Sequence, residues 1–382
     1  MYVMIISRGY PTNKYKMNGI FEFDQAKALA KAGCKVAFAA IDVRSIRRWR
    51  KWGLERHEIQ GVNVYVINIP VGRLPKVIKR KVMSIGLNIL YKIILKELGK
   101  PDVLHAHFTE VGYVAAILKQ QINVPLVITE HSSRVNKIVI EKRLFNIAAQ
   151  AYVQADAVIA VSPSLVTAIK NNFNIKACYV PNVVDTDIFT YAPREASETF
   201  NFVSTGNLII TKRMDLTIKA FNSAFHDFPR VTLTIFGDGD ERSKLEEIIK
   251  EYNLESRVML MGMCSREVIK EKLKISDCFV LASRSETFGV SYIEALATGV
   301  PVIATKCGGP ETFVHEDNGL MIPVDNLDAL VTAMKYMYQN SKTFDREKIS
   351  SEIKSEFSPE YVSRKLVEVY EEVLIERTGE KR

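Results

Sequence analysis

The stretch SRSETFGVSYIEALATGVP, residues 283–301, places two glutamates around an expected helix start. Glu286 stands before the sequence Phe-Gly-Val, where an irregular segment turns helical, and Glu294 follows about one and a half turns into the helix. The unpaired backbone N–H groups and the positive dipole end of a helix start suit a phosphate group. The segment therefore predicts a phosphate site at the start of a short helix, with a carboxylate on either side.

The spacing of the two carboxylates indicates what kind of ligand they flank. At a rise of about 1.5 Å per residue, we expect them to lie on the order of 10 Å apart. That distance is too long for the paired carboxylates of a retaining glycosidase, which are about 5 Å apart. It fits a nucleoside diphosphate sugar, with one carboxylate at the sugar, one at the ribose hydroxyls and the diphosphate at the helix start between them.

Length and composition are those of an ordinary globular protein that is large enough for two domains. The chain has 382 residues, of which 47% are hydrophobic and 25% are charged. Its five cysteines are scattered without a CxxC pair, which indicates neither a disulfide framework nor a zinc site and favours a reducing, cytoplasmic compartment. No apolar run approaches the roughly 18 residues of a membrane-spanning helix, and MYVMIISRGYP is expected to be a first strand rather than a leader.

Short β-branched runs alternate with amphipathic stretches along the chain. YVMIIS and KVAFAAI, for example, are expected strands, with a helix from Phe21 to Ala32 between them. Such alternation is typical of an α/β fold in which helices cover both faces of parallel sheets. A break rich in turn formers, residues 181–200, is expected to link two Rossmann-like domains, whose ligands would bind in the cleft between them.

The motifs within this frame resemble those of one glycosyltransferase family along nearly the whole chain. The segments ETFGV, EA and TGVP around Glu286 and Glu294 resemble the E-x7-E signature of retaining, nucleotide-sugar-dependent glycosyltransferases of the GT-B fold, family four (glycosyl transferases group 1). PNVVDTDIF resembles the interdomain linker of that family. The resemblance implies an acceptor-binding domain over residues 1–184, a nucleotide-sugar-binding domain over 185–357, and a closing helix over 358–382 that packs back on the first domain.

The resemblance also implies roles for individual residues of the second domain. Glu286 would contact the donor sugar and support the oxocarbenium-like transition state, Glu294 would bind the ribose, and Lys212 would neutralise the diphosphate leaving group. Three further residues would offer backbone N–H groups to the distal phosphate and the sugar: Phe288, Gly289 and Val290.

In the first domain the resemblance implies that Gly19 lets the backbone approach the donor phosphates and that His131, in LVITEHSS, organises the reacting sugar. Closure of the two domains would assemble one site from both. One departure concerns the leaving group, because Asn207 stands where the family often carries an arginine. Arg213, beside Lys212, is the neighbouring cation that could take its place.

Neither a metal nor a redox cofactor is expected. Asp185 in VDTD and Asp238 in DGD belong to segments that resemble the D-x-D metal motif of the other major glycosyltransferase fold, but turn chemistry explains these aspartates. His105 and His107 lie two apart on one strand face without an evident third ligand, which favours a structural role. FGDGD lacks the third glycine of a dinucleotide fingerprint.

The net charge of +8 is concentrated in two segments, residues 44–56 and 73–100. No nucleic-acid motif accompanies them. The pattern fits an anionic membrane surface, with tryptophans at the headgroups and basic residues on lipid phosphates, and it also fits solvated helices with a core-facing stripe. The membrane hypothesis rests first on Arg47, Arg48, Trp49, Lys51 and Trp52.

Taken together, these patterns predict a retaining hexosyltransferase that moves a sugar from a nucleoside diphosphate donor to an acceptor hydroxyl. The resemblance implies front-face substitution, in which the leaving phosphate accepts the proton of the acceptor. A sugar or lipid-linked acceptor, polysaccharide or cell-envelope synthesis, and a cytoplasmic or peripheral position at the inner membrane face are expected. Two alternatives are a non-catalytic module that binds nucleotide sugars and a nucleotide-sugar epimerase.

Overall fold

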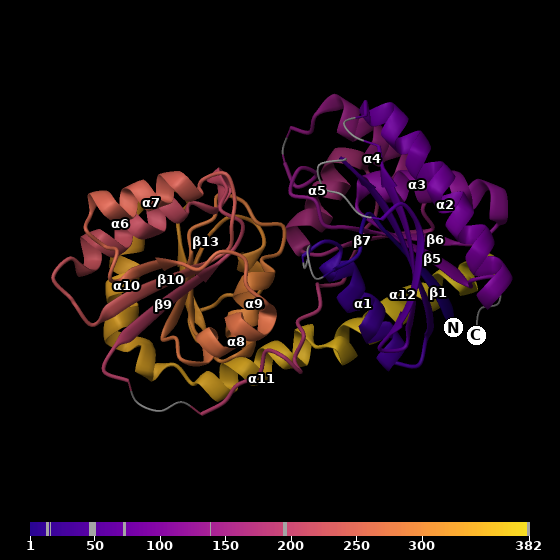
Figure 1. Cartoon of the computed structure of the whole chain (residues 1–382). Helices are drawn as coiled ribbons and strands as arrows, with labels where there is room; N and C mark the ends of the chain where they lie inside the picture. The colour runs from indigo at the N-terminus through magenta and orange to yellow at the C-terminus, as the bar shows by residue number, and fades with distance from the viewer. Residues whose placement is uncertain are drawn as a thin grey trace. The chain divides into compact units, whose positions relative to one another are not determined.

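The structure is a computed structural model that describes residues 1–12, 15, 17–45, 51–71, 74–137, 139–193 and 197–379. The chain divides into two compact units: unit 1 comprises Met1–Val183 and Pro359–Arg382, and unit 2 comprises Val184–Ser358. Each unit has its own mainly parallel sheet with helices packed against it (Figure 1). The predicted α/β fold with two Rossmann-like parallel-sheet domains is confirmed.

Unit 1 contains the strands β1 (Tyr2–Ser7), β2 (Lys35–Arg44), β3 (Gly53–Ile59), β4 (Val62–Pro70), β5 (Val103–His107), β6 (Leu126–Glu130), β7 (Ala157–Ala160) and β8 (Cys178–Tyr179). They lie in the order β3-β4-β2-β1-β5-β6-β7-β8. Neighbouring strands are parallel except for β3, which runs antiparallel to β4. Every residue of β1 and β5 is buried, as expected for central strands covered on both faces.

The edge strand β3 is absent from the expected strands. Its residues GLERHEI are mostly polar and exposed, so the apolar signal of a buried strand is missing. The strand exists because its backbone pairs with β4, from Gly53 opposite Asn68 to Ile59 opposite Val62. Tertiary pairing therefore decides this element.

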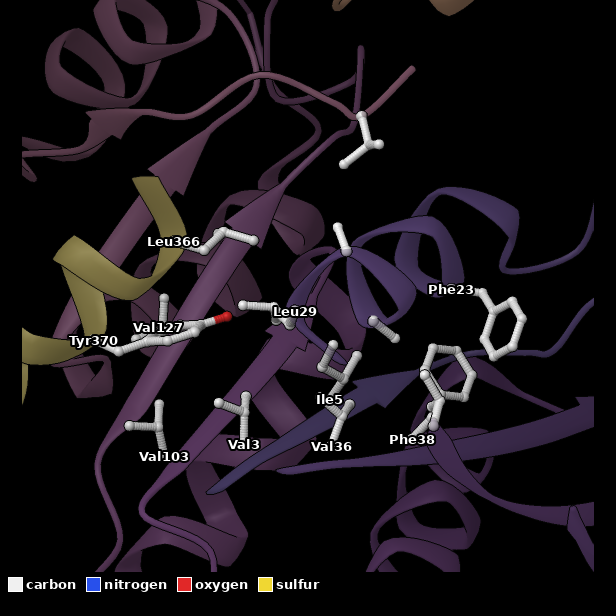
Figure 2. Close-up of a cluster of buried hydrophobic side chains, with 14 of the residues drawn as sticks. Val3, Ile5, Phe23, Leu29, Val36, Phe38, Val103, Val127, Leu366 and Tyr370 are labelled. Carbon is white, nitrogen blue, oxygen red and sulfur yellow. The ribbon is translucent and has the colours of Figure 1, made fainter. Parts of the chain in front are cut away.

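The sheet of unit 1 is covered by the helices α1 (Ile20–Lys31), α2 (Lys76–Leu98), α3 (Thr109–Ile122), α4 (Lys142–Gln154), α5 (Pro163–Phe173) and α12 (Pro359–Thr378). Helix α1 packs against α12, and α3 packs against both α2 and α4. Figure 2 shows Leu366 and Tyr370 of α12 beside the sheet residues Val3, Val103 and Val127. A helix from the far end of the sequence thus completes the core of unit 1.

Unit 2 contains the strands β9 (Phe200–Thr205), β10 (Val231–Phe236), β11 (Val258–Leu260), β12 (Cys278–Leu281), β13 (Val302–Thr305) and β14 (Gly319–Ile322). They lie in the order β11-β10-β9-β12-β13-β14, and neighbouring strands are parallel. This is the doubly wound order, in which the strand order reverses between β9 and β12. The carboxyl ends of those two strands border the crevice where such sheets bind ligands.

The helices of unit 2 are α6 (Met214–Phe225), α7 (Arg242–Glu251), α8 (Arg266–Lys274), α9 (Val290–Ala297), α10 (Leu327–Asn340) and α11 (Arg346–Phe357), with short 3-10 turns η2 (Ile210–Lys212), η3 (Pro310–Thr312) and η4 (Ser341–Thr343). Helix α6 packs against α7 and α10, and α9 packs against α11. Helix α11 is absent from the expected helices. Asp345 caps it by accepting the backbone N–H of Lys348 (3.0 Å), and Ile349, Ile353 and Phe357 are buried.

Candidate active site

The carboxyl ends of β9 and β12 carry two of the predicted site residues. Lys212 ends the turn η2 after β9, and Glu286 lies in the loop after β12. The backbone N–H of Arg284 donates to the carbonyl of Thr211 (2.8 Å), which joins the two loops. Two residues that are 74 positions apart therefore meet where a doubly wound sheet binds its ligand.

Lys212 and Glu286 form an ion pair that is largely shielded from solvent. Lys212 Nζ lies 2.5 Å from Glu286 Oε1, and the exposed fractions of the two side chains are 20% and 10%. Ser283 Oγ donates to the same carboxylate oxygen (2.6 Å). The backbone N–H of Glu286 donates to the carbonyl of Cys307 (3.2 Å), and burial raises the pKa of the Cys307 thiol to about 12. A fixed cation, a fixed carboxylate and a neutral thiol thus lie together.

The start of α9 follows directly after Glu286. Gly289 precedes the helix with a φ of 100°, and a Cβ there would lie 2.8 Å from a ring carbon of Tyr292, so the position requires glycine. The ring of Phe288 packs against Phe313 at a centroid distance of 5.5 Å. Among the described residues no side chain caps this start. The first backbone N–H groups of this helix are therefore left without a side-chain cap, as a phosphate site at a helix start requires.

Glu294 lies inside α9 with only 9% of the residue exposed. The Nε of Arg266, the first residue of α8, lies 3.5 Å from Glu294 Oε1, and the Arg266 side chain is 12% exposed. A buried carboxylate is expected to have such a partner. Arg266 is absent from the residues expected from the sequence, because nothing in the local pattern of α8 indicates that its first residue meets α9.

Arg213, the cation next to Lys212, is paired with two aspartates. Its guanidinium donates to Asp215 (3.0 and 3.3 Å) and pairs with Asp325. Although burial acts to raise the pKa of Asp215, the hydrogen bonds and charge of Arg213 hold that pKa below its usual range. Arg213 therefore braces the loop beside Lys212, and Asn207 itself is exposed.

In unit 1 the loop after β1 carries Gly19, which precedes α1 with a φ of 72°. A Cβ at this position would lie 2.2 Å from the carbonyl oxygen of Gly9. Ser7 Oγ donates to that carbonyl (2.8 Å) and lies 3.2 Å from Glu22 Oε1. Burial raises the pKa of Glu22. The backbone at Gly19 thus packs directly on the backbone of Gly9. This loop follows β1, the strand at which the strand order of the unit 1 sheet reverses.

His131 follows β6, and its buried ring lies beside the rings of His107 and Phe108. Its Nε2 lies 3.0 Å from His107 Nδ1, and its ring centroid lies 4.8 Å from that of Phe108. The guanidinium of Arg8 lies 4.0 Å from the Phe108 centroid. Burial, followed by the positive charge of Arg8, lowers the pKa of His131 to about 3, so the ring is neutral.

Glu130 fixes the backbone that carries His131. Its Oε1 accepts the N–H groups of His131 (2.9 Å) and Ser132 (2.8 Å), and its Oε2 accepts the hydroxyls of Thr109 (2.5 Å) and Tyr152 (2.7 Å). These four hydrogen bonds satisfy a fully buried carboxylate. Thr109 and Tyr152 are distant in sequence from Glu130, so no local pattern indicates these contacts.

The residues considered for metal binding have other partners. His105 Nε2 lies 2.7 Å from Thr129 Oγ1, and the Tyr370 hydroxyl lies 2.6 Å from His105 Nδ1. Asp185 and Asp238 each accept a backbone N–H within their own turn. Across the described part of the chain, no three His, Cys, Asp or Glu residues are grouped so that they could hold a metal ion.

Two family sequence models match the chain, one described as Glycosyl transferases group 1 over residues 188–355 and one as Glycosyltransferase Family 4 over residues 23–188. N-acetyl-alpha-D-glucosaminyl L-malate synthase of Bacillus anthracis is 27% identical over 279 residues, 67% of this chain and 71% of that protein. One subunit of the phosphatidylinositol N-acetylglucosaminyltransferase of Arabidopsis thaliana is 26% identical over 286 residues, 72% of this chain and 63% of that protein.

Solved structures share the fold over almost the whole chain. Sucrose-phosphate synthase from Thermosynechococcus elongatus has a TM-score of 0.80 at 20% identity, covering 98% of this chain and 100% of that one. HepE of Anabaena in complex with UDP-glucose has a TM-score of 0.75 at 17% identity, covering 97% of this chain and 100% of that one. At these identities the likeness shows the fold alone.

Proposed function

We propose that the chain is a glycosyltransferase that transfers a sugar from a nucleoside diphosphate sugar to an acceptor hydroxyl with retention of the anomeric configuration. Two glycosyltransferase family models, which match residues 188–355 and 23–188, and the likeness of its fold to that of sucrose-phosphate synthase support this proposal. The observation that carries the proposal is the shielded Lys212–Glu286 pair beside the start of α9. The nucleotide of the donor is supported by HepE, whose solved structure contains UDP-glucose.

The charges of unit 2 are arranged for the departure of a diphosphate. Negative charge develops on the leaving group as its bond to the sugar breaks, and a preorganised cation with aimed N–H groups stabilises that charge. Lys212 and the first turn of α9 would provide both, because Lys212 can exchange Glu286 for a phosphate oxygen. Glu286 would then be free to contact sugar hydroxyls and to stabilise positive charge on the ring, while Glu294 holds the ribose.

The proposed step is a front-face substitution. The bond between sugar C1 and the diphosphate oxygen breaks, and the bond between C1 and the acceptor oxygen forms on the same face. The acceptor proton passes to the departing phosphate oxygen, so no side-chain base is required. The route also needs no side-chain nucleophile, and the neutral Cys307 thiol beside Glu286 is not activated to serve as one.

The remaining predicted residues belong to unit 1. We assign to Gly19 a backbone contact with the donor phosphates and to His131 a contact with the reacting sugar. Closure of the two units over one donor stays a prediction. The acceptor is proposed to be a sugar or a lipid-linked sugar of polysaccharide or cell-envelope synthesis, used by an enzyme that works in the cytoplasm at the inner face of the membrane.

Nucleoside diphosphate release from UDP-, GDP- and ADP-sugars, followed by mass spectrometry, tests the proposal. Lys212→Ala and Glu286→Ala should each lower kcat by more than about tenfold. Lys335→Ala and Glu247→Ala, which remove the same side-chain types at exposed positions of unit 2, should leave kcat unchanged.

Each alternative has its own outcome in these assays. Conversion of the donor sugar without an acceptor would indicate an epimerase, and a donor that raises the Tm without any turnover would indicate a binding module. An inverted product anomer would refute retention. Unchanged turnover in the Lys212 or Glu286 variant would remove that residue from the mechanism.

A further inference from the structure

The outward side of α2 carries apolar side chains where a surface helix usually carries polar ones. Its exposed large apolar residues have exposed fractions between 41% and 62%: Val77, Ile78, Ile85, Ile89 and Leu95. They recur at helical spacing on the side opposite the buried residues Met83, Leu87, Leu90 and Ile94. The helix therefore presents one apolar side to the sheet and a second one outward.

Lysines are interspersed among these outward apolar residues. Lys81, Lys92 and Lys96 are exposed on the same side of α2. Within Lys76–Leu98 the only acidic residue is Glu97, beside six lysines and arginines. Glu97 already has partners, because Oε1 lies 2.9 Å from Arg56 and Oε2 accepts the Tyr65 hydroxyl (3.0 Å). The outward side of α2 is thus both apolar and positively charged.

The edge strand β3 adds exposed side chains on the side of the sheet that α2 covers. Arg56 of β3 reaches Glu97 of α2, so alternate residues of β3 point to the side of the sheet that α2 covers. Leu54, two residues earlier, has that orientation and is 37% exposed, and Trp52 just before the strand is 54% exposed. Lys51 is also exposed. Three residues on which the membrane hypothesis first rests, Arg47, Arg48 and Trp49, lie outside the described residues.

We propose that this basic–apolar face, formed by Trp52, Leu54, the five outward apolar residues of α2 and Lys81, Lys92 and Lys96, docks on an anionic lipid bilayer. The apolar side chains would enter the headgroup layer while the lysines bind lipid phosphates. Among the described residues no helix is long and apolar enough to cross a membrane, so α2 would lie in the plane of the surface. In Figure 1, α2 lies beside α3 in the helical layer of unit 1.

Charge and exposure favour a bilayer over the other partners. A second copy of the chain would bring like-charged lysines together across a symmetric interface, which opposes association. A nucleic acid would use the lysines but would leave the exposed isoleucines in water. The inference rests on the proposed function for its purpose, since a lipid-linked acceptor is found at such a surface, but vesicle binding itself requires no turnover.

Flotation of the full chain with vesicles tests the docking surface. We expect binding to vesicles that mix phosphatidylcholine with phosphatidylglycerol, weaker binding to phosphatidylcholine alone, and a loss of affinity as salt rises. The double variant Ile85→Asp, Ile89→Asp should abolish flotation, and Lys81→Gln or Lys92→Gln should each weaken binding about fivefold. Tyr336→Asp, at a 47% exposed position of α10 in unit 2, is the matched control and should float like the wild type.

Several results would overturn the docking proposal. They are flotation of the Ile85, Ile89 variant at wild-type level, equal binding to neutral and anionic vesicles, and binding of a DNA or RNA fragment in place of vesicles. A concentration-dependent dimer that this variant abolishes, without vesicle binding, would also overturn it. Nucleoside diphosphate release is measured on the same variants to distinguish the docking proposal from the proposed sugar transfer. Vesicle binding without turnover would contradict only the transfer, and turnover without vesicle binding would contradict only the docking.

An independent observation concerns the proton shared by His107 and His131. His107 Nδ1 lies 3.0 Å from His131 Nε2, and the rings are stacked with an interplanar angle of 27°. Burial lowers the pKa of both rings, so both are neutral at pH 7. Between two neutral imidazoles, one nitrogen must donate and the other must accept. Each ring therefore has one defined tautomer.

The contact with His107 is what can select the tautomer of His131. His131 Nδ1 and His107 Nε2 are both buried and have no hydrogen-bond partner within the described part of the chain. The 3.0 Å contact between His107 Nδ1 and His131 Nε2 therefore couples the two rings, because the nitrogen that donates there fixes where each ring carries its proton. We infer that His107 is a positioning residue that holds His131 in one tautomer for its contact with the sugar.

Nitrogen-15 NMR of the histidine rings tests this inference directly. The wild type should show His131 in a single tautomer, His107→Phe should show a mixture of both tautomers, and His107→Asn should restore a single one, because the asparagine amide again hydrogen-bonds to His131 Nε2. If His131 has its proposed role, kcat should fall about tenfold or more in His107→Phe, with KM little changed, and should recover in His107→Asn. A mixture of tautomers in the wild type, or the same single tautomer in His107→Phe, would overturn the inference whatever the turnover.

Discussion

Replacing Gly19 with alanine tests whether the site requires the close approach between the backbones of Gly19 and Gly9 in the loop after β1. The added Cβ would lie 2.2 Å from the Gly9 carbonyl oxygen, and a separation of 3.0 Å requires that one of them move by at least 0.8 Å. The movement would disturb the hydrogen bond from Ser7 Oγ to the same carbonyl (2.8 Å). Because the atom in the way is backbone, no side-chain rotation can relieve the contact.

Gly33→Ala is the matched control for this substitution. Gly33 has a φ of 88°, close to the 72° of Gly19, but a Cβ there would meet nothing within 4 Å. Both variants force a left-handed residue, which costs about 1 kcal/mol. Only Gly19→Ala adds the steric overlap and the lost hydrogen bond, which cost about 1–3 kcal/mol more. We therefore expect losses of about 1 kcal/mol in the free energy of unfolding for Gly33→Ala and about 2–4 kcal/mol for Gly19→Ala.

Turnover should separate the two variants more clearly than stability. A displacement near 1 Å in a substrate-positioning loop lowers the rate by about a hundredfold. Nucleoside diphosphate release should therefore show kcat/KM lowered about a hundredfold in Gly19→Ala and nearly unchanged in Gly33→Ala. Urea unfolding of both proteins provides the stability comparison. If Gly19→Ala matches Gly33→Ala in both measurements, the close packing at Gly9 has no role in the site.

Three further perturbations have defined outcomes. Asn207→Arg adds an exposed cation near Lys212 and should tighten nucleoside diphosphate binding about tenfold by calorimetry; unchanged affinity would refute the expectation that an arginine at this position contributes to binding the leaving group. Tyr370→Phe removes the 2.6 Å hydrogen bond to buried His105 and should lower the free energy of unfolding by about 1–3 kcal/mol in urea, whereas an unchanged midpoint would contradict it. Burial depresses the pKa of His105 and His131 to about 3 in the folded state, so stability should be full above about pH 6.5 and fall toward pH 3. At pH 5 each of the two rings should lower the free energy of unfolding by about 2 kcal/mol relative to pH 7. A urea midpoint that is the same at pH 7 and pH 5 would contradict this.

The strands of both sheets and the short helix between the two glutamates could be predicted because their signals are local. The run YVMIIS is buried on both faces, and its six apolar or small residues are enough to predict a strand. In the same way, the glycine before α9 is a local signal of where that helix begins. Helix α11 and strand β3 show the limit of this reasoning. The polar β3 is a strand only because β4 lies beside it.

The residues of the candidate site were identifiable one by one, but their partners were not. No local sequence pattern indicates that Lys212 contacts Glu286, that Arg266 contacts Glu294, or that His107 contacts His131. These pairs form because parallel strands distant in sequence end at the same sheet edge, where burial leaves each charge or ring nitrogen in need of a partner. Local chemistry was sufficient for the fold class and the candidate residues, whereas the tertiary structure alone decided which atoms meet, because the strand order brings them together.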